Sequence, residues 1–281
     1  MTIRIVTDST CDLPPPLAEE LNITVLPAYV NIGEDSYLDG VELSRSEFYR
    51  QLPGYKTPPT TAAPAIGVFA EAYDRLADDG ASEILSVHLA SNLSGMLNAA
   101  RLGGKAAERA RVTVFDSRQL TMGLGFIVLQ AAREARAGKA LPEIVADLED
   151  TVQRTHVFAA LDTLEFLRRS GRVSWAEFGI GTLLRIKLIV HVYDGEVHSL
   201  EKVRTFSRAQ RHLIEHVRDL GPLEQIALLH TANRDGVRQL EEAAQTLIPQ
   251  EYDPIAVEVT PTIGAHVGPG ALGFACVACP S

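Results

Sequence analysis

The sequence has few cysteines and no long apolar run. Its 281 residues include three cysteines, Cys11, Cys276 and Cys279, which are too few and too unevenly spaced for a disulfide framework. No apolar stretch reaches the roughly 18 residues that a membrane span needs. The chain also runs from Met1 into the polar Asp8 without the apolar core of a signal peptide. We therefore expect a cytoplasmic protein without stable membrane insertion.

The sequence also has fewer basic than acidic residues. The sequence has 26 Lys and Arg against 36 Asp and Glu, a formal net charge of −10. Such a surface repels phosphate backbones, which argues against a nucleic-acid partner. Residues 161–220 are the exception, with ten Lys and Arg against eight Asp and Glu. This segment indicates either a basic face for an acidic partner or an ordinary solvated face with salt bridges.

The common catalytic and cofactor motifs are absent. The sequence has no Walker A motif, no GxGxxG after a strand, no GxSxG and no HExxH. Cys276 and Cys279 have CxxC spacing, but they close an apolar strand and have no second pair, so we expect neither a zinc site nor a redox centre. The residues alone thus indicate a protein without metal or cofactor, better suited to binding than to catalysis.

In the first half of the chain, short apolar runs alternate with polar turns and with segments of helical periodicity. This alternation predicts parallel strands with helices on both faces of the sheet. The expected strands are 3–6, 23–30, 84–89 and 112–115, and the expected helices are 17–21, 44–52, 65–78, 96–107, 123–137 and 142–154.

The pattern changes after residue 155. Asp194-Gly195 predicts a hairpin between strands 186–192 and 197–203. Further strands are expected at 157–161, 225–229, 255–259 and 272–278, with helices at 163–169, 207–219 and 234–247. The fold class is therefore α/β, with an N-terminal doubly wound parallel-sheet domain (1–158) and a C-terminal α+β domain with a mixed sheet (159–281).

A polar turn at residues 91–95 lies between an expected strand and an expected helix. The first turn of a helix has free backbone N–H groups and partial positive charge, so a carboxylate or phosphate binds there readily. Ser94 can donate its hydroxyl to such an anion, and Gly95 lets a ligand approach the backbone. An ordinary N-cap serine is the alternative.

Two other segments are candidates for a binding site. Residues 263–270 form a glycine-rich loop that contains His266, and Thr60-Thr61 lies in a proline-rich loop. His266 can donate a hydrogen bond to a carboxylate, transfer a proton or ligate a metal, or it can be purely structural. The two threonine hydroxyls can line a site.

Polar residues also follow two expected strands, as Asp8-Ser9-Thr10 and as Asp116-Ser117. Ligands of doubly wound folds bind beyond the carboxyl ends of strands, but the same residue types form ordinary turns. Asp116, Ser117 and His266 would be the members of a hydrolytic set.

The chain resembles the DegV family of bacterial fatty-acid-binding proteins. The similarity covers about residues 3–280 and rests on an ordered set of short motifs rather than on one signature. These motifs are Ile5–Pro14 (IVTDSTCDLP), Tyr37-Leu38-Asp39-Gly40, Pro59-Thr60-Thr61, Leu93-Ser94-Gly95, Val114-Phe115-Asp116-Ser117, Gly171-Arg172-Val173-Ser174, Ile186-Lys187, Glu201-Lys202-Val203-Arg204 and residues 263–270.

The resemblance implies a non-catalytic protein that binds one long-chain fatty acid, such as palmitate or stearate, between two domains. It implies that Thr61, Ser94, Gly95 and His266 hold the carboxylate. It further implies a fatty acid kinase as partner, which converts the bound acid to acyl phosphate for phospholipid synthesis. A hydrolase, or a carrier of another anionic lipid, remains the alternative.

The acyl tail requires an apolar tunnel. We expect its walls on helix faces, although the same residues would serve equally as ordinary core: Phe69, Leu124, Ile127, Val128 and Leu164. Arg172, Lys202 and Arg204 are expected to face the kinase.

Overall fold

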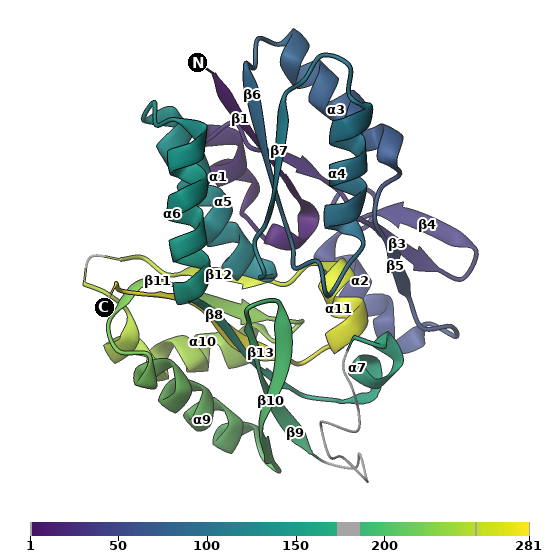
Figure 1. Cartoon of the computed structure of the whole chain (residues 1–281). Coiled ribbons are helices and arrows are strands. Elements are labelled where there is room, and N and C mark those ends of the chain that lie inside the picture. Colours follow the sequence, from purple (N-terminus) through teal and green to yellow (C-terminus); the bar gives the residue numbers. More distant parts are fainter. Residues whose placement is uncertain (1, 173–185, 251, 281) are drawn as a thin grey trace.

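The computed structural model describes residues 2–172, 186–250 and 252–280. Its first sheet has four parallel strands in the order β2-β1-β6-β7. Helices lie on both faces of this sheet (Figure 1). The strands are β1 (Ile3–Asp8), β2 (Thr24–Leu26), β6 (Glu83–His88) and β7 (Val112–Asp116), and the helices are α1 (Pro15–Glu20), α3 (Ile66–Asp78), α4 (Met96–Ala106), α5 (Thr121–Arg136) and α6 (Leu141–Arg154).

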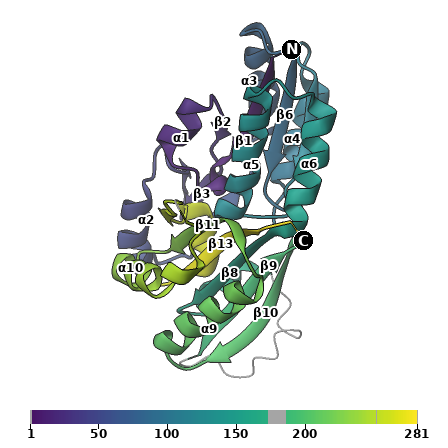
Figure 2. The ribbon, with the colours of Figure 1, turned by 90° about the vertical axis from the view of Figure 1, so that its left-hand side faces the viewer.

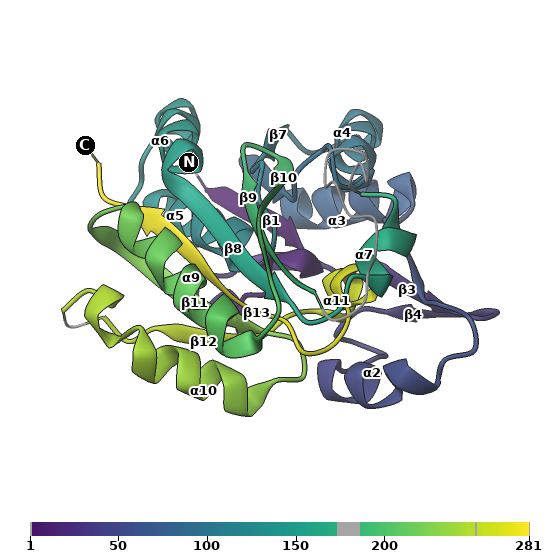
Figure 3. The same ribbon diagram turned by 90° about the horizontal axis from the view of Figure 1, so that it is seen from below.

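The second sheet is mixed and has six strands in the order β10-β9-β8-β13-β11-β12. All neighbours are antiparallel except β11 and β12. Helices α9 and α10 cover its outer face (Figure 3). The elements are β8 (Thr155–Leu161), α7 (Glu165–Ser170), β9 (Lys187–Tyr193), β10 (Glu196–Val203), α9 (Phe206–Asp219), β11 (Leu223–His230), α10 (Arg234–Ala243), β12 (Ile255–Glu258), α11 (Pro261–Val267) and β13 (Leu272–Ala278).

These two sheets confirm the predicted fold class. The Asp194-Gly195 hairpin is also confirmed, because β9 and β10 pair across it and both residues have positive φ. The predicted domain boundary at 158/159 falls inside β8, a continuous strand of the second sheet.

A third, small sheet was not predicted. It consists of β3 (Tyr29–Ile32), β4 (Asp35–Leu38) and β5 (Thr60–Ala62), in the order β4-β3-β5, and α2 (Arg45–Gln51) follows β4 in the chain. The apolar run at 23–30 is therefore two strands of different sheets rather than one. The Thr60-Thr61 loop is an edge strand, paired with β3 thirty residues away in sequence.

The glycine-rich segment with His266 is a helix, α11, and not a loop. It begins after Thr260 and ends at Gly268, whose φ of 75° only glycine adopts without strain. Gly264 lies inside this helix. A larger residue does not fit there, because an added Cβ would be 2.4 Å from the Tyr49 hydroxyl of α2. Figures 1 and 2 show α11 between the two large sheets, beside the small one.

Candidate functional site

A cavity of about 240 Å³ lies where the carboxyl ends of the first sheet meet the inner face of the second. Most of the described residues that line it are apolar. Strands β8, β9 and β11 supply a large part of the wall with the small or branched side chains of Val157, Ala159, Val190, Val192 and Leu229. A cavity of this composition suits an elongated hydrocarbon.

Polar groups from three separate elements are among the residues that line this cavity. They are Thr61 of β5, the Ser94-Gly95 turn before α4, and His266 in the last turn of α11. The Thr61 Oγ1 and the His266 Nε2 lie 2.9 Å apart. The four residues predicted from the sequence are thus brought to a single cavity, although they are spread over more than 200 positions.

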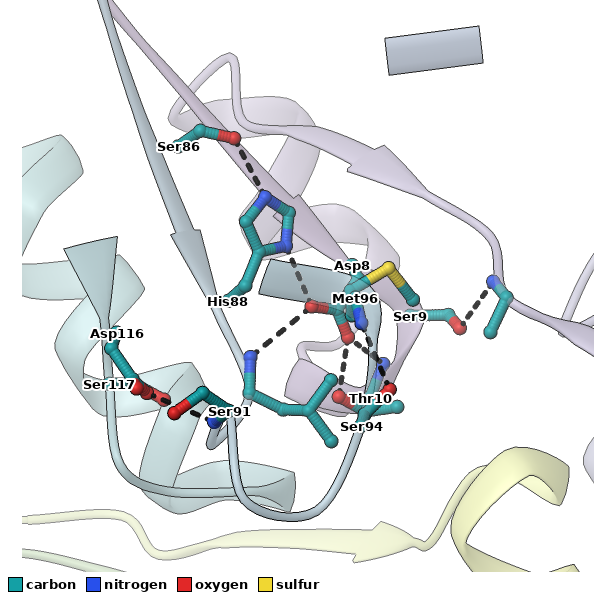
Figure 4. A network of polar contacts seen from close by, with 12 residues as sticks. Asp8, Ser9, Thr10, Ser86, His88, Ser91, Ser94, Met96, Asp116 and Ser117 are labelled. Carbon is teal, nitrogen blue, oxygen red and sulfur yellow. Dashed lines mark hydrogen bonds and ion pairs between the residues drawn. The ribbon is translucent and has the colours of Figure 1, made fainter. Parts of the chain in front are cut away.

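Ser94 makes a hydrogen bond at the start of α4, and its role toward an anion stays a prediction. Its Oγ accepts a hydrogen bond from the Met96 amide at 3.2 Å, which makes it a local cap of α4 (Figure 4). A hydroxyl that accepts in this way still has its own proton to donate. Gly95 has an ordinary φ of −73°, and an added Cβ would meet nothing within 4 Å. Open space thus adjoins the positive end of an 11-residue helix.

A network of hydrogen bonds between buried polar side chains lies next to this turn. The Asp8 carboxylate accepts from the His88 Nδ1 at 2.8 Å and from the Leu89 amide at 3.3 Å, and the Ser86 Oγ lies 2.7 Å from the other His88 ring nitrogen (Figure 4). Asp8, Ser86 and His88 are fully buried. Asp8 also accepts from the Thr10 amide at 3.1 Å. Asp8 therefore links the ends of β1 and β6, just before Thr10 and Leu89, which line the cavity.

The Asp116-Ser117 pair forms a turn and not a hydrolytic centre. Ser117 is fully buried and bonds the Gln119 backbone, with its Oγ 3.3 Å from the carbonyl and 3.1 Å from the amide. Asp116 accepts from the Ser91 amide at 3.4 Å. His266 lines the cavity and bonds Thr61 instead, so the three residues do not form a nucleophile–base arrangement.

Electrostatics keep His266 neutral at pH 7. Burial, reinforced by the positive charge of Arg172, lowers the pKa of His266 from 6.5 to about 4. The imidazole therefore offers one N–H donor and one acceptor and carries no charge. Arg172 lines the same cavity and supplies positive charge there.

Arg172 also borders a second, more open hollow of about 470 Å³, together with Ser94 and Gly95. The cavity and this surface hollow thus share four lining residues, Leu93, Ser94, Gly95 and Arg172. Lys202 and Arg204 are exposed at the end of β10 and beyond it. Val173 and Ser174, which belong to the motif of Arg172, lie outside the described residues.

The five predicted tail-lining residues do not line the cavity, which corrects that expectation. Phe69, Leu124, Ile127 and Val128 have no exposed surface and belong to the core between the first sheet and its helices, and Leu164 is 2% exposed in a separate cluster. Phe69 of α3 and Leu124, Ile127 and Val128 of α5 pack in the core that covers the parallel sheet and not at this cavity.

The residues that do line the cavity have a recognisable sequence pattern. In β8, Val157, Ala159 and Leu161 line the cavity, whereas Phe158 and Ala160 pack into the core under α9. Alternate residues of a strand face opposite sides of a sheet. A strand whose two faces are both apolar, with small residues on one of them, is the pattern expected when one face borders a cavity.

Within residues 2–172, 186–250 and 252–280, no group of three or more His, Cys, Asp and Glu side chains has the geometry to hold a metal ion. Cys276 is buried and Cys279 exposed, and burial raises the pKa of the Cys276 thiol. In the same described part of the chain, no helix has the length and apolar character needed to cross a membrane.

The fold and the site together define a class of α/β protein with a largely apolar cavity whose lining includes hydroxyl and imidazole groups. A family model described as "Uncharacterised protein, DegV family" matches residues 2–278. The chain belongs to the DegV family.

Relatives and solved structures agree with this assignment. A DegV domain-containing protein of Halalkalibacterium halodurans is 33% identical over 278 residues, which cover 97% of each chain. A DegV family protein of Thermus thermophilus, whose structure is described by its fatty acid binding, superposes with a TM-score of 0.90 at 32% identity, over 99% of this chain and 100% of the other. DegV of Bacillus subtilis, described as a fatty acid binding protein, gives a TM-score of 0.86 at 29% identity, over 99% of each chain.

Proposed function

We propose that this protein binds a long-chain fatty acid, such as palmitate or stearate, with the tail in the apolar cavity between its two domains. The observation that carries the proposal is that this cavity brings Thr61, Ser94 and His266 together. A tail of about 15 methylenes contributes on the order of 12 kcal/mol before the costs of binding. That energy is available only if the carboxylate is also satisfied, because a buried carboxylate without partners is very costly.

The head-group site meets this requirement with neutral donors and one nearby cation. The donors on this proposal are the hydroxyls of Thr61 and Ser94, the N–H of His266 and the backbone N–H groups that follow Gly95. Arg172 adds positive charge. The set is suited to hold an anion by charge-assisted hydrogen bonds. The protein on this proposal is a carrier and not an enzyme.

The direct test is the lipid that the purified protein carries. Mass spectrometry of the denatured wild type should detect a co-purified acid of about 14 to 18 carbons. Ser94→Ala combined with His266→Ala should remove most of it while the protein stays folded. Equal occupancy in the two proteins would contradict the head-group assignment. A different anionic lipid in the wild type would contradict the fatty acid.

We further propose that a fatty acid kinase phosphorylates the bound acid. Ser94, Gly95 and Arg172 border both the cavity and the open hollow, so a carboxylate held there can be reached from the surface. Arg172, with the exposed Lys202 and Arg204, would then contact an acidic partner surface.

This second proposal predicts a separation of binding from phosphorylation. Reversing the charges of Lys202 and Arg204 should slow acyl-phosphate formation by the kinase and leave fatty-acid affinity unchanged. Reversing Arg238, an exposed arginine of α10, is the matched control. Equal turnover with all three proteins would refute the partner face.

A further inference from the structure

Two buried carboxylates hold the start of α11, the helix that carries His266. Asp39, which follows β4, is 2% exposed and accepts from the Thr262 Oγ1 at 2.5 Å and from the Thr260 Oγ1 at 2.6 Å. Asp12, which is 1% exposed, accepts from the Thr260 amide at 2.9 Å. Both carboxylates lie at the positive end of the helix, where negative charge is favourable.

The start of α11 differs from an ordinary N-cap in the bonding of the Thr260 hydroxyl. Thr260 is the N-cap residue of α11, but its side chain makes no capping bond to the helix and bonds Asp39 instead. Asp39 also accepts from the Ser9 Oγ at 2.8 Å, and that same Oγ accepts from the Ala28 amide at 3.1 Å. Asp39 therefore ties the start of α11 to the end of β1 and to the small sheet.

The small sheet also carries the hydrogen-bond partner of His266. Thr61 of β5 pairs with Val30 of β3, and Val30 pairs with Tyr37 of β4, two residues before Asp39. One rigid sheet thus holds Asp39 at the start of α11 and Thr61 at its end. Because α11 has seven residues, fixing its first turn also fixes its last.

Close packing leaves α11 little freedom to shift. Gly264 contacts α2 so closely that an added Cβ would be 2.4 Å from the Tyr49 hydroxyl, and that hydroxyl donates to the Val259 carbonyl at 2.9 Å. At the other end, an added Cβ on Gly268 would lie 2.4 Å from the Phe166 ring. The hydrogen bonds to Asp39 therefore hold a helix that is closely packed against α2 and Phe166.

We infer that Asp39 is a positioning residue for the head-group site: through Thr260 and Thr262 it orients α11 so that the His266 imidazole meets Thr61 at the cavity. Asp39 does not line the cavity and acts through other residues. The inference rests on the proposed function for its effect on fatty acids, but its effect on His266 can be measured without any ligand.

The test uses Asp39→Asn, which keeps the shape of the side chain and removes its charge, with Asp35→Asn on exposed β4 as the matched control. Asp39→Asn should weaken palmitate affinity by about tenfold or more, the loss expected when a charged acceptor is removed. In a His266→Gln background the same substitution should have little further effect, because the residue through which it acts is gone. A full additive loss in that background would refute the positioning role.

The ligand-free readout is the NMR titration of His266 in the whole protein. In the Asp39→Asn variant, the ring signals should shift and the pKa of His266 should move up toward 6.5, because the ring is less well held in its buried site. An unchanged His266 titration would overturn the inference even if no fatty acid binds. Failure of the wild type alone to bind palmitate would instead refute the proposed function.

Thr262 provides a second route if Asp39→Asn does not fold. Thr262→Val removes the donor to Asp39, and Thr262→Ser keeps it. Valine keeps the shape of threonine and lacks the donor, whereas serine keeps the donor and lacks a methyl group, so an effect of shape alone would appear in the serine variant. The inference requires the perturbed His266 titration in the valine variant and its recovery in the serine variant. The same titration in both variants would overturn it.

Discussion

Thr61→Val is the sharpest test of the head-group geometry, because the two side chains have almost the same shape. Valine also suits the edge strand β5, so the backbone pairing with β3 should persist. The variant loses the hydroxyl whose oxygen lies 2.9 Å from the His266 Nε2. It therefore loses both the proposed donor to the carboxylate and the hydrogen-bond partner of the imidazole.

The size of the loss follows from these contacts. A hydrogen bond to a charged group contributes about 1.5–3 kcal/mol, so Thr61→Val should weaken binding by about ten- to a hundredfold. Isothermal titration calorimetry of delipidated protein with palmitate measures this change. A Thr61→Val, His266→Gln double mutant should lose less than the sum of the single losses, because the two side chains are in contact.

Thr60→Val is the matched control. Thr60 precedes Thr61 on the same strand, is exposed, and its hydroxyl lies 3.4 Å from the Asn31 Nδ2 rather than at the cavity. It should bind palmitate as the wild type does. If Thr60→Val and Thr61→Val give the same affinity, the proposed head-group site is wrong.

Three further predictions concern stability and the cavity. Gly268→Ala should lower the free energy of unfolding in urea by about 1–3 kcal/mol, because a φ of 75° with extended ψ strains any other residue and the new Cβ would meet Phe166; wild-type stability would contradict this packing. Burial raises the pKa of Asp12 from 3.8 to about 6, so the native state binds the proton more tightly than the unfolded state. The wild type should therefore lose stability relative to Asp12→Asn as the pH rises from about 4 to about 6, and a difference that is flat over this range in denaturation curves would refute the assignment. Ala159→Phe should fill the cavity from β8 and reduce co-purified lipid to background by mass spectrometry, whereas retained lipid would place the tail elsewhere.

The parts of the fold that depend on local pattern could be predicted from the sequence. Apolar runs, polar turns and helical spacing placed most strands and helices of the two large sheets, and the Ser94-Gly95 turn was found because it lies between such elements. Its function as a carboxylate site stays a prediction.

The elements that were missed depend on distant partners. Helix α11 contains Gly264, which locally argues against a helix but is required by Tyr49 of α2, more than 200 positions earlier. Edge strand β5 has three residues and is defined by pairing with β3. Apolar helix faces such as that of Ile127 belong to the core, whereas the cavity is lined by strand faces such as that of Ala159, and local apolarity alone does not distinguish the two.

The walls of the cavity extend from Thr10 to Gly273, so nearly the whole chain must be folded before the cavity exists. A ligand that occupies it binds the native chain and not the unfolded one, and at a hundred times its Kd such a ligand adds about 2.7 kcal/mol to the free energy of unfolding. On the proposed function, a bound fatty acid fills the apolar cavity and adds to the hydrophobic core. Resistance of the protein to heat and to proteases should accordingly rise and fall with the supply of free lipid in the cell.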